Sequence, residues 1–268
     1  MLYAICLLNM ENNQKGFWTK ITKSDQYRAI NDLIVESQSG STYYTLLVLS
    51  SIVIAAGLLL ANSAILIGGM LITPLLTPIL LFSLGVTTGR PLLIKRTAIL
   101  ILKSMGVVFV VAFMAGIVFS TPEDKEFFSS SIFNDTIKAA FLYFIVAFAS
   151  GIAATFAWIR KKVDSMLPGI SVAVSLVPPI ALVAIWIAEL NFDTARFFLM
   201  VFLFNMIGII MGSMIVFSML RFYRADDAIE ASLNKVVKEE VAEKKKMEEE
   251  VESDVIEKLD DKTEILKK

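Results

Sequence analysis

Apolar and polar residues are segregated into long blocks along this chain. Six apolar stretches of about 20 residues follow a polar opening, and short polar segments separate them. We place them at Thr42–Ala61, Ala64–Leu84, Ala98–Ser120, Ile137–Ile159, Leu167–Ala188 and Phe197–Leu220. A helix of about 20 residues crosses roughly 30 Å of hydrocarbon, and lipid cannot satisfy an open backbone. The pattern therefore predicts an all-α integral membrane protein with six transmembrane helices.

The composition supports a membrane protein and excludes several kinds of site. Hydrophobic residues make up 56% of the chain and its mean hydropathy is +0.69, above the usual range for soluble domains. The sequence has no histidine and a single cysteine, Cys6, which excludes a Cys/His zinc site, a histidine base and a disulfide framework. The opening MLYAICLLNMENN lacks a basic region and a small-residue cleavage site, so we expect no cleaved signal peptide.

Lys and Arg predict the orientation in the membrane. They precede the first span and recur after the second, fourth and sixth: Lys15, Lys20, Lys23, Arg28, Arg90, Lys95, Arg96, Arg160, Lys161, Lys162, Arg221 and Arg224. The alternate loops are poorer in these residues. Because short basic loops stay in the cytoplasm, we expect a multi-pass protein of the cell membrane. Segment 1–41 and segment 221–268 would then both be cytoplasmic.

The two terminal segments differ in character. The tail from Ala225 to Lys268 is rich in Glu, Lys and Asp, with apolar residues three and four apart, which suits an amphipathic helix. It is either a coiled coil that joins protomers into a homo-oligomer or a solvated, partly disordered helix. Its mixed charge gives no support for nucleic-acid binding. The N-terminal segment is too short for its own core, but residues around Leu33 could form an interfacial helix.

Two segments resemble each other at a nearly constant spacing. Ile67–Ile79 has the sequence IGGMLITPLLTPI, and Pro168–Ile180 has PGISVAVSLVPPI. The matching pairs are Gly68 with Gly169 and Pro78 with Pro179, 101 positions apart, and Lys103 with Asn205 and Gly106 with Gly208, 102 positions apart. This favours an internal duplication with three spans per copy, at about 42–120 and 137–220, over a chance match between apolar helices. An odd number of spans inverts the second copy, as in many secondary transporters.

Prolines within these motifs predict broken helices. A proline in a helix removes a backbone donor and clashes with the preceding turn, and the freed carbonyls need a partner such as a hydroxyl, a water or a solute. We therefore propose a solute site at the breaks, near the midplane. Its candidate residues are Thr73, Pro74, Thr77, Pro78, Lys103, Ser171, Ser175, Pro178, Pro179 and Asn205. The alternative is a pair of kinked packing helices whose freed groups are satisfied internally.

These motifs also carry a resemblance to a known family. GGMLITPLLTPI before a basic loop, and LPGISVAVSLVPPIALVAI further on, resemble the uncharacterised hydrophobic membrane proteins grouped as domain of unknown function 389. The likeness covers roughly Thr42 to Leu220. Some members carry a folded cytoplasmic domain ahead of the spans, where this chain has only a short segment. The resemblance implies the membrane architecture and, since the family has no assigned activity, no particular function.

Charged side chains are rare within the predicted spans. Every acidic residue between Thr42 and Leu220 falls in a predicted loop, which argues against an aspartyl dyad or a carboxylate proton relay. Lys103 lies inside the third span, where it either faces the interior or snorkels to the cytoplasmic face. Asn205, in the sixth span, either bridges helices or binds solute. Asn62 is expected to cap the second helix.

Two functions of different class follow from this. The first is a transporter or channel for a small polar solute, favouring an anion because Lys103 would supply the positive charge at the broken helices. The second is a membrane scaffold or signalling subunit whose charged tail recruits a partner. We expect no enzymatic activity, cofactor or metal, because no nucleophile–base pair or ligand set is visible.

Overall fold

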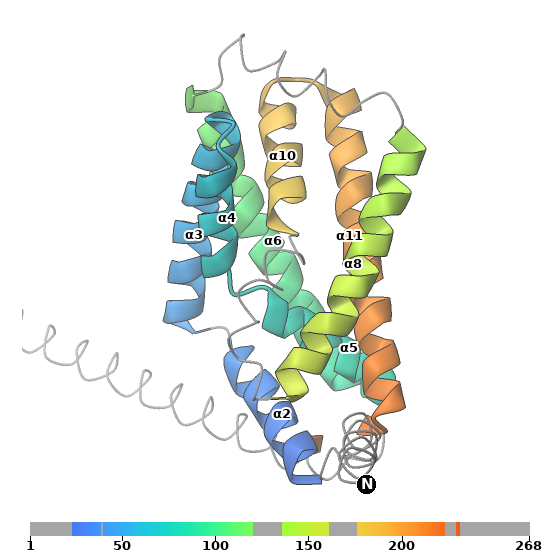
Figure 1. Cartoon of the computed structure of the whole chain (residues 1–268). Coiled ribbons are helices and arrows are strands. Elements are labelled where there is room, and N and C mark those ends of the chain that lie inside the picture. Colours follow the sequence, from blue (N-terminus) through green and yellow to red (C-terminus); the bar gives the residue numbers. More distant parts are fainter. Residues whose placement is uncertain (1–22, 39, 120–135, 161–175, 223–228, 231–268) are drawn as a thin grey trace, which may run out of the picture. The chain divides into compact units, whose positions relative to one another are not determined.

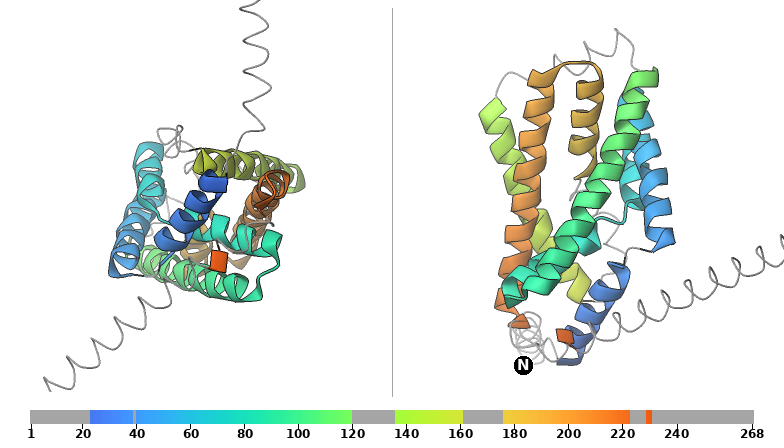
Figure 2. Two further views of the ribbon diagram at one scale, coloured as in Figure 1. Left: turned by 90° about the horizontal axis from the view of Figure 1, so that it is seen from below. Right: turned by 180° about the vertical axis from the view of Figure 1, so that it is seen from behind.

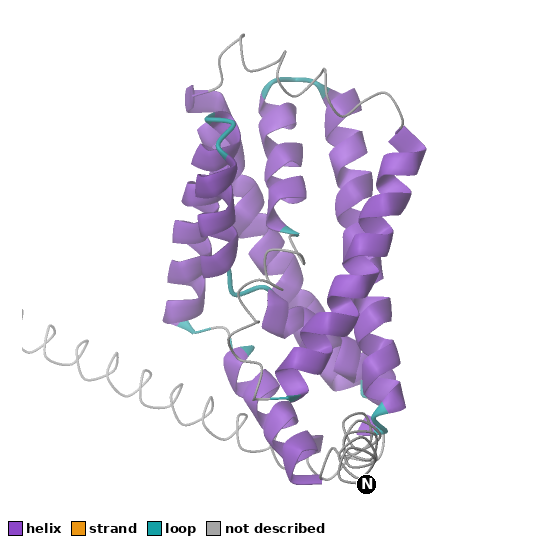
Figure 3. Ribbon diagram, in the orientation of Figure 1, coloured by secondary structure: helices purple, strands orange, loops and turns teal. Residues whose placement is uncertain are grey.

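The computed structural model describes residues 23–38, 40–119, 136–160, 176–222 and 229–230. Within these ranges the chain is helical apart from short connections (Figure 3), which confirms the predicted all-α class. The chain divides into two units, Met1–Ala225 and Asp226–Lys268. The helices below belong to the first unit, and the predicted helical tail, apart from two residues, lies outside the described ranges.

The first unit contains eight helices among its described residues (Figure 1). They are α2 (Lys23–Glu36), α3 (Ser41–Leu59), α4 (Ser63–Ile72), α5 (Leu76–Thr88), α6 (Pro91–Phe119), α8 (Thr136–Ile159), α10 (Val177–Ala188) and α11 (Phe192–Met219). The N-terminal segment thus does form a helix, α2, whose apolar face is buried against α5 and α8.

Four helices are long and apolar enough to cross a membrane: α3, α6, Phe141–Ile159 of α8, and α11. The pair α4 and α5 counts as a fifth if it is one span bent by 55° at its break. The 12-residue α10 is apolar but shorter. Because the fifth predicted span is described only from Leu176 onward, a count of six spans stays a prediction.

Two helices begin earlier than the apolar pattern indicates. α6 starts at Pro91, so Lys95 and Arg96, which we assigned to a loop, lie in its first turns. Proline suits the first position of a helix because its fixed φ matches and its missing N–H would be unpaired there. α11 starts at Phe192, where the side chain of Asn191 accepts a hydrogen bond from the Thr194 amide at 3.2 Å. Both helices therefore extend beyond their apolar segments.

The chain directions of the helices are opposed between the two parts of the bundle. In Figure 1, α3 and α6 rise while α8 and α11 descend; Figure 2 gives the same arrangement from below and behind. Helices α5 and α10 both begin near the middle of the bundle, from where α5 descends and α10 rises. α10 packs on α6 and α5 packs on α11, so each short helix contacts a long helix from the other part of the chain.

Helices α8 and α11 approach most closely, through glycines. A Cβ built on Gly212 would lie 2.3 Å from the Phe148 carbonyl oxygen, and one on Gly151 would lie 2.4 Å from that of Ile209. Small residues let backbones approach in this way, which favours association of membrane helices. Any larger side chain at these positions would force the two helices apart.

Helix boundaries recur at a spacing of 101 residues. α5 begins at Leu76 and α10 at Val177 (177−76), each preceded by a leucine in the αR region. A residue with positive φ follows each helix, and these two residues are also 101 positions apart: Gly89 at 67° and Leu190 at 60°. The closing hydrogen bonds match as well: Arg90 N–H donates to the Gly85 carbonyl at 3.1 Å, and Asn191 N–H donates to that of Trp186 at 2.9 Å.

Candidate functional site

Helices α4 and α5 are separated by a sharp break whose cause is Pro74. Proline cannot donate to the carbonyl four residues earlier, and it pushes the residue before it into extended backbone. Thr73 accordingly has φ −70° and ψ 122°, and the axis turns by 55° at this point. The predicted broken helix is therefore present in this part of the chain. At the other end of α4, the Asn62 side chain accepts from the Ala64 and Ile65 amides, which confirms the expected cap.

Three further prolines of the motifs lie in the first turns of helices. Pro78 is the third residue of α5, and Pro178 and Pro179 are the second and third residues of α10. Amides in a first turn have no intrahelical acceptor, so proline costs little there. Pro78 therefore does not interrupt α5. Whether Pro178 and Pro179 break a longer helix stays a prediction, because the residues that precede Leu176 lie outside the described ranges.

The break leaves backbone groups without partners. Thr73 satisfies two carbonyls of the last turn of α4. Its hydroxyl donates to the Gly69 carbonyl at 3.0 Å, and its amide donates to the Met70 carbonyl at 3.4 Å. Among the described residues, no backbone or side-chain group bonds the carbonyls of Leu71 and Ile72. Unpaired backbone groups inside hydrocarbon cost several kcal/mol each, so these two carbonyls require a partner from outside the described residues.

A cleft of about 420 Å³ opens beside the break. Its described lining comes from the end of α2, the start of α3, the α4–α5 break and α8: Glu36, Gln38, Gly40, Thr42, Tyr43, Leu46, Thr73, Pro74, Leu76, Thr77 and Trp158. Three of the predicted site residues, Thr73, Pro74 and Thr77, thus share one cavity. Glu36 is the only charged side chain in the described lining.

A chain of hydroxyls connects the cleft to α6. The hydroxyls of Tyr43 and Ser104 are 2.8 Å apart, and Ser104 donates to the Leu100 carbonyl at 2.9 Å. Because the Ser104 proton is used in that bond, Ser104 accepts from Tyr43. The Tyr43 hydroxyl can therefore accept a hydrogen bond from a further partner, but it has no proton left to donate.

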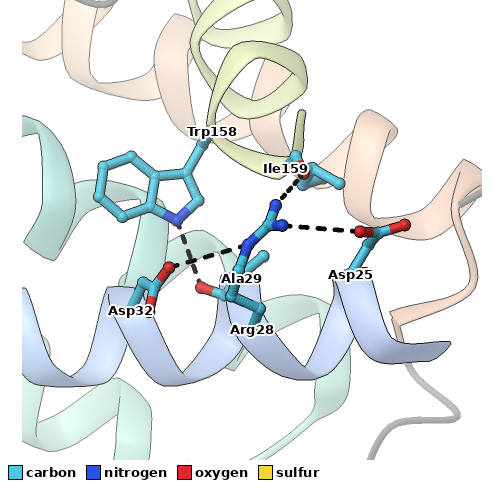
Figure 4. Close-up of polar contacts among 6 residues, drawn as sticks. All are labelled: Asp25, Arg28, Ala29, Asp32, Trp158 and Ile159. Carbon is cyan, nitrogen blue, oxygen red and sulfur yellow. Dashed lines mark hydrogen bonds and ion pairs between the residues drawn. The ribbon is translucent and has the colours of Figure 1, made fainter. Parts of the chain in front are cut away.

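Helix α2 contributes its end to the cleft and is hydrogen-bonded to the ends of two long helices. The Arg28 guanidinium donates to the Ile159 carbonyl at the end of α8 at 3.0 Å (Figure 4), and Gln26 donates to the Leu220 carbonyl beyond α11 at 2.7 Å. The Trp158 indole donates to the Ala29 carbonyl within α2 at 3.2 Å. The first two bonds satisfy carbonyls that a helix end leaves free, and the cation at the end of α8 complements its dipole.

The Glu36 carboxyl at the rim of the cleft is electrostatically perturbed. Burial, and secondarily the negative charge of Asp32, raise its pKa above the ordinary value of 4.5. Asp32 itself lies 4.0 Å from Arg28, which also pairs with Asp25 at 3.6 Å. Glu36 is therefore an acid with a raised affinity for protons, and it forms no ion pair within the described residues.

The remaining predicted site residues lie elsewhere. Lys103 is on the exposed side of α6, next to Leu102, which is 74% exposed, so of the two interpretations its position favours snorkelling. Asn205 is buried in α11, and its Oδ1 has no hydrogen-bond partner among the described residues. Pro178 and Pro179 are buried at the start of α10. Ser171 and Ser175 lie outside the described residues.

The burial pattern also changes which residue corresponds to Asn205. At a spacing of 101, buried positions of α6 fall on buried positions of α11: Leu100 with Val201, Ser104 with Asn205, and Val108 with Ile209. At the spacing of 102 that the sequence match suggested, the exposed Lys103 would fall on the buried Asn205. At a spacing of 101, Asn205 falls on Ser104, which is also buried.

Five polar or aromatic residues of the cleft were not among the predicted site residues: Glu36, Gln38, Thr42, Tyr43 and Trp158. All lie outside the proline motifs from which the site was predicted. A signal did exist for two of them, because Tyr and Trp gather where spans meet the membrane surface. Tyr43 begins the first span and Trp158 ends the fourth, so the predicted topology puts both at the same side of the membrane.

Comparisons with known proteins give a family and no activity. The family described as "Domain of unknown function (DUF389)" matches residues 70–211, which include the break and the starts of α10 and α11. An uncharacterized protein of Methanocaldococcus jannaschii is 26% identical over 208 residues, covering 78% of this chain and 62% of that relative. The chain thus spans less than two thirds of this relative's length. No solved structure matches the chain.

Proposed function

This chain belongs to the DUF389 family, and from that premise we propose that it is a multi-pass membrane transporter or channel for a small polar solute. The observation that carries the proposal is the α4–α5 break, where the Leu71 and Ile72 carbonyls have no partner among the described residues, beside a cleft of about 420 Å³. Broken helices in the membrane are tolerated where they line a cavity, and transporters use them to bind solute.

The recurrence of helix boundaries supports two inverted repeats as the frame for this site. α5 and α10 begin with the same cap geometry 101 residues apart, and both start near the middle of the bundle while running in opposite directions. Alternating access in many carriers is a rocking of two such repeats around a midplane site. The cell-membrane location and the cytoplasmic position of both termini remain part of this proposal, on the evidence of the basic loops.

The anion preference that we expected from Lys103 loses its basis, because that side chain lies on the exposed side of α6. The scaffold alternative depends on residues 231–268, which lie outside the described ranges. Transport of a small polar solute is therefore the function that the described site favours.

Uptake into proteoliposomes tests this function. Radiolabelled propanamide, ethylammonium and propionate would represent neutral, cationic and anionic solutes of similar size. We expect at least one of them to enter faster than into protein-free vesicles. Leu46→Trp, which fills the cleft from a position that is 38% exposed, should lower that uptake severalfold. Leu49→Trp is the matched control on α3, since Leu49 is 52% exposed and does not line the cleft.

Two outcomes would contradict the proposal. One is an uptake of all three solutes that equals the rate into protein-free vesicles. The other is an uptake that Leu46→Trp and Leu49→Trp change equally, because the route would then lie outside the cleft.

A further inference from the structure

We propose that the cleft at the α4–α5 break binds a small protonated amine, an alkylammonium ion. This inference deepens the proposed function by naming the class of solute, and it rests on that function only for the step of transport. The binding itself is argued from the charge, the hydrogen-bonding capacity and the aromatic surface of the lining residues.

The first step concerns hydrogen-bonding capacity. The Thr73 proton is used on the Gly69 carbonyl, and the Tyr43 proton on Ser104. The Trp158 indole N–H is used on the Ala29 carbonyl. These three side chains therefore have no N–H or O–H left for the cleft, and the two hydroxyl oxygens can only accept. An ammonium group, which has donors and no acceptor, complements these three side chains, while Gln38, Thr42 and Thr77 in the same lining can also donate.

The second step concerns helix dipoles. The C-terminal end of α4 carries a partial negative charge and the N-terminal end of α5 a partial positive charge of similar size. Since these ends meet at one break, their fields at the cleft largely oppose each other. Pro78 removes one amide from the first turn of α5, which weakens the partial positive charge at that helix end. The Leu71 and Ile72 carbonyls at the same break have no partner among the described residues and could accept a hydrogen bond.

The third step concerns formal charge. With the helix ends opposed, the Glu36 carboxylate sets the sign of the cleft, because it is the only charged side chain in the described lining. The nearest cation on α2, Arg28, is directed to the Ile159 carbonyl and to Asp25 and Asp32 (Figure 4). An anion would therefore meet a carboxylate, while a cation would meet a counter-ion.

The fourth step concerns the aromatic side chains. Tyr43 and Trp158 both line the cleft, and neither indole nor phenol can offer its proton there. What they present is ring surface and, for Tyr43, an oxygen. Aromatic rings attract ammonium groups through their negative faces, and they also cover an alkyl chain. A carboxylate with two aromatic side chains suits an organic cation better than a hydrated metal ion.

Calorimetry on the full-length protein in lipid nanodiscs at pH 7 tests the inference. Ethylammonium chloride is titrated against sodium chloride at equal ionic strength, and sodium propionate serves as an anion of similar size. We expect saturable heat from ethylammonium alone. Absence of ethylammonium binding, or equal binding of propionate or sodium, would overturn the proposal.

Variants locate the bound ion. Glu36→Gln should weaken ethylammonium binding by about tenfold or more, which corresponds to loss of a charge-assisted hydrogen bond. Asp32→Asn, one turn away on α2 and outside the lining, should change it by less than about threefold. Tyr43→Phe, which keeps the ring, should weaken it by about threefold to tenfold. Equal effects of Glu36→Gln and Asp32→Asn would refute a site in the cleft.

Two further results separate this inference from the proposed function. Leu46→Trp should abolish ethylammonium binding even if Glu36→Gln does not fold, and binding that survives it would place the ion elsewhere. Uptake of propanamide or propionate that Leu46→Trp blocks, without any ethylammonium binding, would overturn the cation site and leave transport standing. Binding without uptake of any solute would support the cation site and contradict transport.

Discussion

The starts of α5 and α10 share one backbone geometry, 101 residues apart, yet their surroundings differ. At α5 the preceding Thr73 and Pro74 line a cleft together with a carboxylate and two aromatic rings. At α10 the first ten residues are all buried, and two prolines leave fewer free amides. Side chains and their neighbours, more than backbone geometry, therefore decide that the start of α5 borders a cleft while the start of α10 is buried.

A second contrast lies in the long helices. We use first half for residues 41–119 and second half for residues 136–219. In the second half, α8 and α11 touch through Gly151 and Gly212. At a spacing of 101, the first half carries Ser50 and Val111 at these positions. The second half thus has a tightly joined pair, while in the first half α3 packs mainly on α4 and α6.

Exchanging a residue between the halves should have the largest effect at Gly212. Gly212→Val installs the residue of the first half, and its Cβ would lie 2.3 Å from the Phe148 carbonyl oxygen. We expect a loss of about 3 kcal/mol in stability from this overpacking, measured by thermal unfolding in detergent. Gly106→Val is the control, since nothing lies within 4 Å of a Cβ there. Equal losses in both variants would show that the contact between α8 and α11 is not close.

The ends of the outer helices offer a second test. α3 turns directly into α4, while the end of α8 is covered by α2 through Arg28. Arg28→Ala removes a charged hydrogen bond to the Ile159 carbonyl and should cost about 1 to 2 kcal/mol. Arg196→Ala removes a cation whose side chain is 81% exposed and should cost at most about 0.5 kcal/mol. If Arg28→Ala and Arg196→Ala lost the same unfolding free energy, α2 would not stabilise the end of α8 through Arg28.

The paired residues Ser104 and Asn205 should respond in opposite directions. Ser104→Ala leaves the Tyr43 hydroxyl without its acceptor and should lower stability by about 1 kcal/mol. Asn205→Leu removes a buried oxygen that has no partner among the described residues and should raise stability by about 1 kcal/mol. A loss of stability in both variants would mean that Asn205 is satisfied in the folded protein.

The smallest effect is expected from the pH dependence of Glu36. Its pKa is raised in the folded state by burial and then by Asp32, so folding favours the protonated form. The resulting stabilisation is present below the ordinary pKa of 4.5 and is lost as the pH rises through the folded-state pKa. The other charged residues near Glu36 on α2 are Asp25, Arg28 and Asp32, which form ion pairs with one another. The melting temperature of wild type minus that of Glu36→Gln isolates Glu36, and should fall toward neutral pH.

Much of the fold was predictable from the sequence, because the apolar blocks, Pro74 and Asn62 act through local rules. The cleft was only half predictable. Thr73, Pro74 and Thr77 follow from the proline motif, but Glu36 and Trp158 reach the cavity through tertiary packing of α2 and α8. The direction of Lys103 was also beyond the sequence, since the apolar surroundings of α6 do not indicate which face is buried.

Helix α2 has a consequence for the order in which the protein assembles. It is synthesised before the long helices, yet its Arg28 and Gln26 bind the carbonyls of Ile159 and Leu220, which leave the ribosome much later. Until then its apolar residues, including Ile30 and Leu33, have no completed surface to pack on. The hydrogen bonds that tie α2 to the ends of α8 and α11 therefore form late in biogenesis, when nearly the whole membrane region has been translated.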